Sequence, residues 1–363
     1  NKKHRNGKKK LIVEEYGVDL TEKALSNNID PVIGRCEELK RIMEILSRRT
    51  KNNPLLIGDA GVGKTAIVEE LARLIVQNKV SDKLRGKRLI SVSIAALVAG
   101  TKYRGEFEER ITKMLKEIEN DDSIILFIDE IHTLMGAGGA EGAIDAANIF
   151  KPALARGKIH LIGATTTDEY KQSIEKDKAI DRRFQMVFIE EPKGELVYDI
   201  LYRLRPLYEE YHGVKVDDEV LRTIISLTDK YIYNRKQPDK AIDVLDEVCS
   251  MVALTVDKDS KVIDECHDKL VEIVNKKNQS IMKQDFKLAT ALRLKEKEIH
   301  SEINNIELKK LKNKNTKVVR NSDVAKVISL KTKIPVYDLD NCKQRFLINL
   351  DNTLRKSVKG QDR

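Results

Sequence analysis

The sequence predicts an α/β protein in which a parallel sheet with helices on both faces is followed by a smaller, all-helical unit. Strand-like apolar runs alternate with helical patterns from about residue 54 to residue 164, which is typical of a parallel sheet. The run Ile124–Ile128 is apolar throughout, as expected of a strand buried on both faces. After Pro192 the strand signals stop, and helical patterns dominate from Leu196 onward.

The elements follow in a regular order along the chain. Residues 1–10 are a basic tail, and the turn-rich segment 29–35 leads into a helix expected at 37–49. The expected strands lie near Leu55 and at 89–94, 124–128 and 159–164, and the expected helices between them lie at 66–77, 105–119 and 141–155.

A glycine-rich loop follows the first of these strands. Residues Gly58 to Thr65 read GDAGVGKT, directly after the apolar run 54–57 and directly before a helical pattern. Glycines at 58, 61 and 63 permit positive φ, so that backbone N–H groups can close around phosphate oxygens at a helix N-terminus. Lys64 would reach the β- and γ-phosphates, and the Thr65 hydroxyl would ligate Mg²⁺. The alternative is a glycine-rich turn before an ordinary helix, but the flanking strand and helix favour a nucleoside triphosphate site.

Two carboxylates end the apolar strand 124–128. Ligands of α/β folds bind at the carboxyl ends of the strands, which is where Asp129 and Glu130 lie. Asp129 suits Mg²⁺, since this cation prefers oxygen ligands, and Glu130 is the candidate general base that orients water. A strand that ends in two solvated acids is the alternative. The glycine-rich loop upstream favours a hydrolytic site.

Composition bounds the classes of function. A length of 363 residues predicts two to three domains, and the net charge of +9 permits a nucleic-acid partner. Tryptophan is absent, aromatic residues are 5% of the chain, and no nucleic-acid motif accompanies the charge, so solvated lysine-rich faces are the favoured interpretation. The four cysteines form no C-x-x-C pair, which fits a reducing compartment and favours neither a disulfide framework nor zinc. No apolar run is long enough to span a membrane.

The stretch from about residue 260 to residue 316 differs from the rest. It is charge-rich, lacks Gly and Pro, and places apolar residues at helical spacing, as in Leu270, Ile273 and Val274. This pattern predicts a helical hairpin or a short coiled coil, with a single solvated helix as the alternative. The chain begins at Asn1 and stops within a pattern at Arg363, so we expect it to be part of a longer polypeptide.

Several motifs together resemble one family, the Clp-type AAA+ protein unfoldases, and specifically their first ATPase ring. The matching segments are DPVIGR at 30–35, SRRTKNNPLLIGDAGVGKTAI at 47–67, KYRGEFEER at 102–110, AEGAIDAANIFKPALARG at 140–157, GATTTDEY at 163–170, RRFQ at 182–185 and QPDKAID at 237–243. The resemblance implies a basic linker at 1–17, a large P-loop ATPase subdomain at 18–191, a small helical subdomain at 192–256 and 317–345, a middle-domain hairpin at 257–316, and the start of a second ATPase domain at 346–363.

The resemblance assigns roles to residues around the loop. Val32 and Ile33 look like the adenine pocket, and Asp239 belongs, with Lys240, to a small-subdomain motif over the nucleotide. Thr166 looks like the sensor that holds the lytic water, with Thr165 as the adjacent alternative. Arg182 and Arg183 look like arginine fingers that reach the neighbouring subunit's phosphate in trans; in sequence alone, such a pair is usually a solvated or ion-paired surface feature. The expected nucleotide cradle is Gly58, Asp59, Ala60, Gly61, Val62, Gly63, Lys64, Thr65 and Ala66, with Mg²⁺ held at Thr65 and Asp129.

Two glycine-flanked loops resemble pore loops of the same family. Tyr103, between Lys102 and Arg104, looks like the axial tyrosine that grips substrate, whereas an ordinary half-exposed tyrosine is the alternative. The segment 136–141 resembles the second pore loop. Two departures from the family pattern are Asp59-Ala60 in place of Glu-Pro, which could loosen the loop, and Gln237 in place of a leucine.

The short middle segment most resembles that of ClpC, because only about 60 residues separate Thr255 from Val318. The resemblance implies an ATP- and Mg²⁺-dependent homohexamer that threads unfolded proteins through a central pore, with a Clp serine peptidase and an adaptor as partners, no nucleic acid and no membrane span. A plastid stroma is the expected location, with a bacterial-type cytoplasm as the alternative. Other readings are a nucleotide-binding hexamer scaffold, a disaggregase without a peptidase, and a nucleic-acid helicase.

Overall fold

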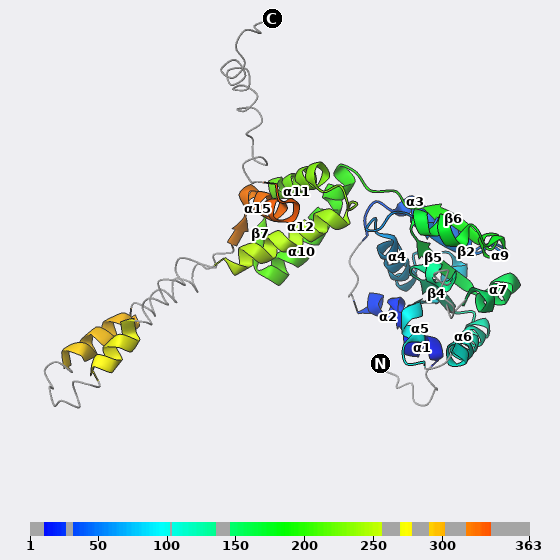
Figure 1. Ribbon diagram of the computed structural model, residues 1–363, viewed down its shortest axis with the longest axis horizontal. Coiled ribbons are helices and arrows are strands. Elements are labelled where there is room, and N and C mark those ends of the chain that lie inside the picture. Colours follow the sequence, from blue (N-terminus) through cyan, green and yellow to red (C-terminus); the bar gives the residue numbers. More distant parts are fainter. Residues whose placement is uncertain are drawn as a thin grey trace, which may run out of the picture. The chain divides into compact units, whose positions relative to one another are not determined.

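The computed structural model of the chain describes residues 11–26, 32–101, 104–135, 146–255, 269–277, 290–301 and 317–334 (Figure 1). The chain divides into two compact units. The first contains residues 1–204 and 228–243, and the second contains residues 205–227 and 244–363. Each unit is described by itself below.

A six-stranded sheet forms the centre of the first unit. Its order is β1-β3-β4-β5-β2-β6, and every neighbouring pair is parallel except β1 and β3. All the strands expected from the sequence are present. Two edge strands, β1 and β6, were not expected. The strand bounds are Gly17–Asp19 (β1), Asn53–Ile57 (β2), Arg88–Val92 (β3), Ile124–Ile128 (β4), His160–Thr165 (β5) and Phe184–Phe188 (β6).

Helices cover both faces of this sheet (Figure 1). One face packs against α2 (Leu20–Leu25), α3 (Cys36–Leu46) and α4 (Lys64–Val76). The other face packs against α1 (Ile12–Tyr16), α5 (Ile94–Val98), α6 (Arg104–Glu119), α7 (Ala147–Arg156) and α9 (Lys178–Asp181). Short turns complete the unit: η1 (Asp82–Leu84), η2 (Ile131–Met135), α8 (Thr167–Glu169) and η3 (Tyr170–Ile174).

Strand β4 shows how the sheet is buried. Successive side chains of a strand point to opposite faces. Ile125 and Phe127 accordingly lie in one core cluster, and Ile124 and Leu126 lie in the other. Every residue of β4 is buried. The continuous apolar run in the sequence therefore reflects a strand covered on both faces.

The segment before the sheet is anchored to it, although the sequence resembles a linker there. Val13 of α1 is fully buried, and the Ile12 backbone N–H donates to Glu117 Oε2 of α6 at 2.7 Å. Arg88 of β3 pairs with Glu14 at 2.7 Å and with Asp19 at 2.8 Å. The polypeptide from residue 11 onward is thus part of the first unit.

The second unit is mainly helical, but it also contains two short strands. Strands β7 (Val214–Val216) and β8 (Lys317–Val319) pair in parallel, so the expectation that strands end after Pro192 is wrong. Each strand has three residues, too few for an alternating pattern to stand out in the sequence. Helix α15 (Asn321–Thr332) follows β8, and helices α10 (Glu195–His212), α11 (Asp218–Tyr231) and α12 (Asp239–Leu254) contribute residues to both units.

Two helical stretches are described between α12 and β8. Residues 269–277 and 290–301 are helical, and Lys277 Nζ lies 2.5 Å from Glu296 Oε2. This ion pair joins the two stretches, which agrees with a hairpin better than with one continuous helix. In the part of the chain that the structure describes, no helix has the length and apolar character required to cross a membrane.

Candidate functional site

The glycine-rich loop connects β2 to α4, as the sequence predicts. Gly61 and Gly63 have φ of 81° and 93°, a conformation that side chains disfavour, and Gly63 is the N-cap of α4. The Gly58 N–H donates to the Thr165 carbonyl at 3.3 Å, which ties the loop to the end of β5. The loop also passes close to Asp239, because a Cβ added at Gly61 would lie 2.8 Å from Asp239 Cβ.

Arg35 supports this loop through a hydrogen bond to its backbone, a role that the sequence analysis did not predict. The side chain is 7% exposed, and its Nη2 donates to the Val62 carbonyl at 3.1 Å and to the Glu190 carbonyl at 2.8 Å. Its Nη1 donates to Glu38 Oε1 at 2.8 Å, so the buried guanidinium is neutralised as well as hydrogen-bonded. The only signal in the sequence was an arginine that directly follows the Ile-Gly of the turn-rich segment.

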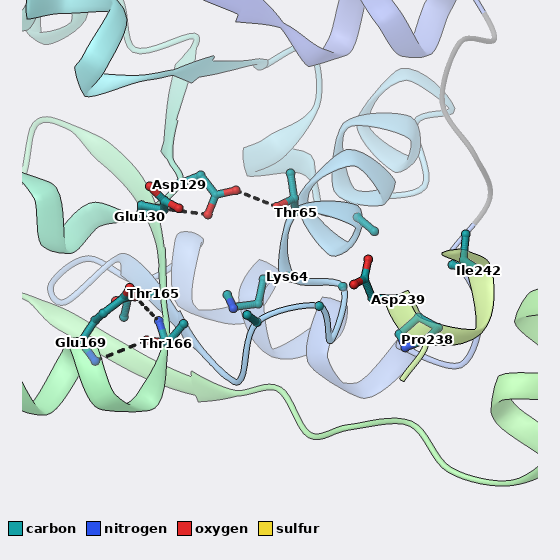
Figure 2. A pocket seen from close by; sticks show the side chains of 14 residues that line it. Lys64, Thr65, Asp129, Glu130, Thr165, Thr166, Glu169, Pro238, Asp239 and Ile242 are labelled. Carbon is teal, nitrogen blue, oxygen red and sulfur yellow. Dashed lines mark hydrogen bonds between the residues drawn. The ribbon is translucent and has the colours of Figure 1, made fainter. Parts of the chain in front are cut away.

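A pocket of about 430 Å³ opens in front of the loop (Figure 2). Its lining comes from the loop, the start of α4, the ends of β4 and β5, and the start of α12. The lining residues are Ala60, Gly61, Gly63, Lys64, Thr65, Ala66, Asp129, Glu130, Thr165, Thr166, Glu169, Pro238, Asp239 and Ile242.

A second, apolar cavity of about 170 Å³ adjoins this pocket. The two share Gly63, Ala66, Pro238 and Ile242. Val32 and Ile33 line the apolar cavity, together with Ile200 and Leu204. A polar pocket that continues into an apolar one has the character of a site for the phosphates and the base of a nucleotide.

The carboxylates that end β4 face the start of α4 (Figure 2). Thr65 Oγ1 donates to Asp129 Oδ2 at 2.7 Å, and the Glu130 N–H donates to Asp129 Oδ1 at 3.0 Å. Glu130 is exposed to the pocket and has φ of 51°, in the left-handed region that non-glycine residues rarely occupy. Such a conformation typically costs about 1–3 kcal/mol and is concentrated at functional sites.

Lys64 is directed back onto the loop. Its Nζ donates to the Gly58 carbonyl at 2.8 Å and to the Asp59 carbonyl at 2.9 Å. Burial lowers the pKa of Lys64, and this effect is opposed by the negative charges of Asp129, Glu169 and neighbouring acids. Lys64 is the only cation among the residues that line the pocket, whereas Asp129, Glu130, Glu169 and Asp239 supply carboxylates.

Thr165 and Thr166 end β5 at the pocket wall. Thr166 is half-buried and Thr165 is 2% exposed. Both are hydrogen-bonded to Glu169, a pocket residue that the sequence reasoning did not single out. The spacing of Thr166 and Glu169 is that of a capping box, and this signal in the sequence could have distinguished Glu169 from the adjacent Asp168.

The two departures from the family pattern are accommodated in this unit. Asp59 Oδ2 lies 3.3 Å from Lys236 Nζ, which also pairs with Glu191 at 3.2 Å. The Gln237 side chain is 2% exposed and donates to Thr228 Oγ1 and Asp229 Oδ1 at 3.1 and 2.8 Å. The ion pair with Lys236 therefore restrains Asp59, although no proline follows it.

Lys240 does not line the pocket, although it belongs to the same motif as Asp239. It is 6% exposed, and its Nζ donates to the Ile232 carbonyl at 3.2 Å and pairs with Asp229 at 3.0 Å. Lys240 thus braces the turn before α12, and only Asp239 of this pair faces the cradle.

The two arginines after α9 lie elsewhere on the surface of the first unit. Arg182 and Arg183 are exposed, and neither is among the pocket residues. No side-chain partner joins either guanidinium within the described ranges of the chain, which agrees with a solvated arginine pair as well as with arginines that reach another copy. Lys102, Tyr103, the Arg104 side chain and the second expected pore loop at 136–141 lie outside the described residues.

The donors at the pocket fit Mg²⁺ bound together with phosphates. No cluster of three or more metal-binding His, Cys, Asp or Glu side chains occurs in the described part of the chain. Mg²⁺ in nucleotide sites is instead held by one or two protein oxygens, with phosphate and water completing the shell. The Thr65 hydroxyl and the Asp129 carboxylate supply such a pair.

A buried strand, a glycine loop at a helix N-terminus and acids at the end of a parallel strand two positions away in the sheet define a P-loop nucleoside triphosphatase. The family model described as "ATPase family associated with various cellular activities (AAA)" matches residues 54–190, and the AAA lid domain model matches residues 194–298. The chain belongs to the AAA family of ATPases, in its Clp branch. The pocket at the glycine loop is therefore the candidate nucleotide site of this ATPase.

Individual relatives cover nearly the whole chain. A Clp protease ATP-binding subunit, ClpA homolog, of Guillardia theta is 48% identical over 96% of this chain and 43% of its own length. Chloroplastic ClpC2 of Arabidopsis thaliana is 46% identical over 96% of this chain and 38% of its own length. The S. cerevisiae Hsp104:casein complex matches with a TM-score of 0.69 and 37% identity, over 96% of this chain and 50% of that one. The chain thus spans less than half the length of these curated relatives.

We predict that Gly61→Ala impairs nucleotide binding, because the added methyl group meets Asp239 and displaces the loop. Gly86→Ala is the matched control: Gly86 also has positive φ, at 69°, but no atom lies within 4 Å of an added Cβ. Both variants should lose about 1–3 kcal/mol of unfolding free energy from backbone strain. Only Gly61→Ala should weaken ATP affinity in calorimetry, by at least about tenfold, equivalent to about 1.4 kcal/mol. Equal affinities for the two variants would contradict the crowded geometry.

Proposed function

We propose that this chain hydrolyses ATP in the described pocket and that copies of it form a ring which uses this hydrolysis to thread unfolded polypeptides. The observation that carries the proposal is the 2.7 Å hydrogen bond from Thr65 to Asp129, with Glu130 beside it. This bond places a loop hydroxyl, a metal-binding carboxylate and a second acid at one point of the pocket. The second acid has no role in simple nucleotide retention, which favours hydrolysis.

The adjoining cavities suggest how ATP lies. The adenine would occupy the apolar cavity that Val32 and Ile33 line. The phosphates would lie against the loop 58–65, where backbone N–H groups and Lys64 would bind them. Bound Mg²⁺ would neutralise phosphate charge. Thr65 and Asp129 would hold that ion, and Lys64 would exchange its two loop carbonyls for phosphate oxygens.

Glu130 is the proposed general base. Its backbone is left-handed, and Glu130 lines the pocket next to Asp129. From there it would orient a water molecule and accept its proton, while the Thr166 hydroxyl would hold the same water. The conformational cost at Glu130 is consistent with a residue positioned for catalysis.

The charge balance of the pocket supports a contribution from a neighbouring copy. Lys64 is the only cation among the described residues of the lining, which leaves the transition-state charge on a transferred phosphoryl group open to further compensation from a neighbouring copy. Arg182 and Arg183 are exposed and are not used in the chain's own pocket. We therefore assign them to the site of the adjacent copy in a homohexamer.

The substrate and partners follow from the family. Lys102, Tyr103 and Arg104 are the proposed substrate grip, and the S. cerevisiae Hsp104 structure was solved with casein. We further propose delivery to a Clp serine peptidase, with an adaptor bound at the middle-domain hairpin 257–316. A plastid location is favoured by the similarity to a chloroplastic ClpC2, and a bacterial-type cytoplasm is the alternative.

We predict that Glu130→Gln retains ATP affinity within about twofold but lowers the turnover number by at least about a hundredfold, because general-base catalysis typically contributes this much. Affinity would be measured by calorimetry and turnover by phosphate release. Glu37→Gln, an exposed position on α3 outside the pocket, makes the same charge change and should leave both values intact. Undiminished turnover in Glu130→Gln would refute the general-base role of Glu130, whereas absence of turnover in the wild-type ring would leave the nucleotide-binding scaffold as the better interpretation.

A mixing experiment tests the arginines. Turnover per chain should rise with protein concentration, since a site completed in trans requires assembly. An Arg182→Ala, Arg183→Ala double variant should be nearly inactive, as should Glu130→Gln. Mixed together, the two should regain activity, because an intact pocket of the first variant can receive the arginines of the second. A mixture as inactive as its components, with assembly verified by light scattering, would exclude these residues as fingers.

The grip is tested separately. In the full-length protein, Tyr103→Ala should keep most ATPase activity, within about threefold, yet slow the unfolding of a fluorescent substrate by at least about tenfold, because a large aromatic contact is lost. Tyr103→Phe keeps the ring and serves as the control. Unfolding by Tyr103→Ala at the wild-type rate would show that force is applied elsewhere.

A further inference from the structure

The Glu169 carboxylate is the centre of a hydrogen-bond network at the pocket edge (Figure 2). Its Oε2 accepts from the Thr166 N–H at 3.0 Å and from Thr165 Oγ1 at 3.3 Å, and lies 3.1 Å from His132 Nδ1. In return, the Glu169 N–H donates to Thr166 Oγ1 at 3.3 Å. One side chain therefore joins the end of β5 to η2, the turn that follows Asp129 and Glu130.

This network treats the two threonines differently. Thr165 is buried, and its hydroxyl donates its single proton to Glu169. Thr166 is half-buried, its oxygen accepts a hydrogen bond from the Glu169 N–H, and its hydroxyl also interacts with the Glu169 carboxylate. Both threonines line the pocket, and Thr166 is the more exposed of the two. Exposure therefore favours Thr166 over Thr165 as the sensor.

The carboxylate is held in its charged form. Burial alone would raise the pKa of Glu169, but the hydrogen bonds from Thr166 and Thr165 and the nearby His132 lower it below its ordinary value. A simple helix cap requires only the reciprocal bonds between Thr166 and Glu169. The added contacts to Thr165 and His132 exceed that requirement.

We propose that Glu169 is a positioning residue of the hydrolytic site, which fixes the Thr166 hydroxyl toward the pocket and ties it to the turn after Glu130. This role rests on the proposed ATP hydrolysis. Glu169 does not itself contact the reacting atoms. It acts through Thr166, by fixing the backbone N–H of Thr166 and occupying the hydroxyl of Thr165.

A double-mutant cycle tests this dependence. Thr166→Ala and Glu169→Ala should each lower the turnover number by roughly tenfold to a hundredfold, because a misplacement of about 1 Å can cost this much, with ATP affinity changed less than about threefold. If Glu169 acts through Thr166, the double variant should be no slower than Thr166→Ala alone. Glu169→Gln keeps an acceptor for the Thr166 N–H and should be intermediate. Asp168→Asn, an exposed acid on the same helix, is the matched control and should behave as wild type.

Amide hydrogen exchange gives a readout that needs no turnover. In the nucleotide-free chain, the Thr166 N–H should exchange at least about tenfold faster in Glu169→Ala than in wild type or Asp168→Asn, because it loses its acceptor. Unchanged exchange, or multiplicative losses of turnover in the double variant, would overturn the proposal. If the wild-type chain shows no turnover, the proposed hydrolysis itself fails; if Thr166→Ala and Glu130→Gln both retain full turnover, the proposed site residues are wrong and the positioning role fails with them. If they are slow and Glu169→Ala is fast, only the positioning role fails.

Discussion

The hydrogen bond between Thr65 and Asp129 joins residues that are 64 positions apart in the chain, and the arrangement of the site depends on it. It is possible because β2, β4 and β5 are parallel, so their carboxyl ends meet at the same edge of the sheet. The glycine loop leaves one of these ends, the acids leave the second, and the threonines leave the third. Burial of the strands on both faces keeps this edge rigid, which is what a site with narrow geometric requirements needs.

The loop is supported by Val62, which is buried in one core cluster, and by several small polar contacts. Arg35 binds the Val62 carbonyl, Thr165 accepts from Gly58, and Lys236 pairs with Asp59. The Arg35 contact is buried and should be the strongest, since the Lys236 pair is largely exposed and such pairs contribute at most about 1 kcal/mol. A loop with three glycines needs such restraints, because glycine has no side chain to restrain its backbone.

The pocket has an excess of carboxylates over cations, which links its chemistry to assembly. A single chain offers Lys64 and the loop N–H groups to a polyanion, and its remaining charged groups are acids. This composition suits a bound phosphate group that is contacted by a metal ion and by hydrogen-bond donors from another copy of the chain. Glu169 adds to the excess, but its charge is directed at Thr165, Thr166 and His132 rather than at the phosphate position.

The sequence alone was sufficient for the sheet strands β2 to β5, the loop, Lys64, Thr65, Asp129 and Glu130. These features are local, because an apolar run, a glycine spacing and a strand end each depend only on residues that are consecutive in the sequence. The contacts of Arg35 and Glu169 and the short strands β1, β6, β7 and β8 could not be found in this way. Arg35 binds a carbonyl 27 residues away, and the capping-box spacing of Thr166 and Glu169 gives no sign of the contacts that Glu169 makes with Thr165 and His132. Tertiary structure alone decided these contacts, because a side chain's partner is set by which segments the folded backbone brings within hydrogen-bonding distance.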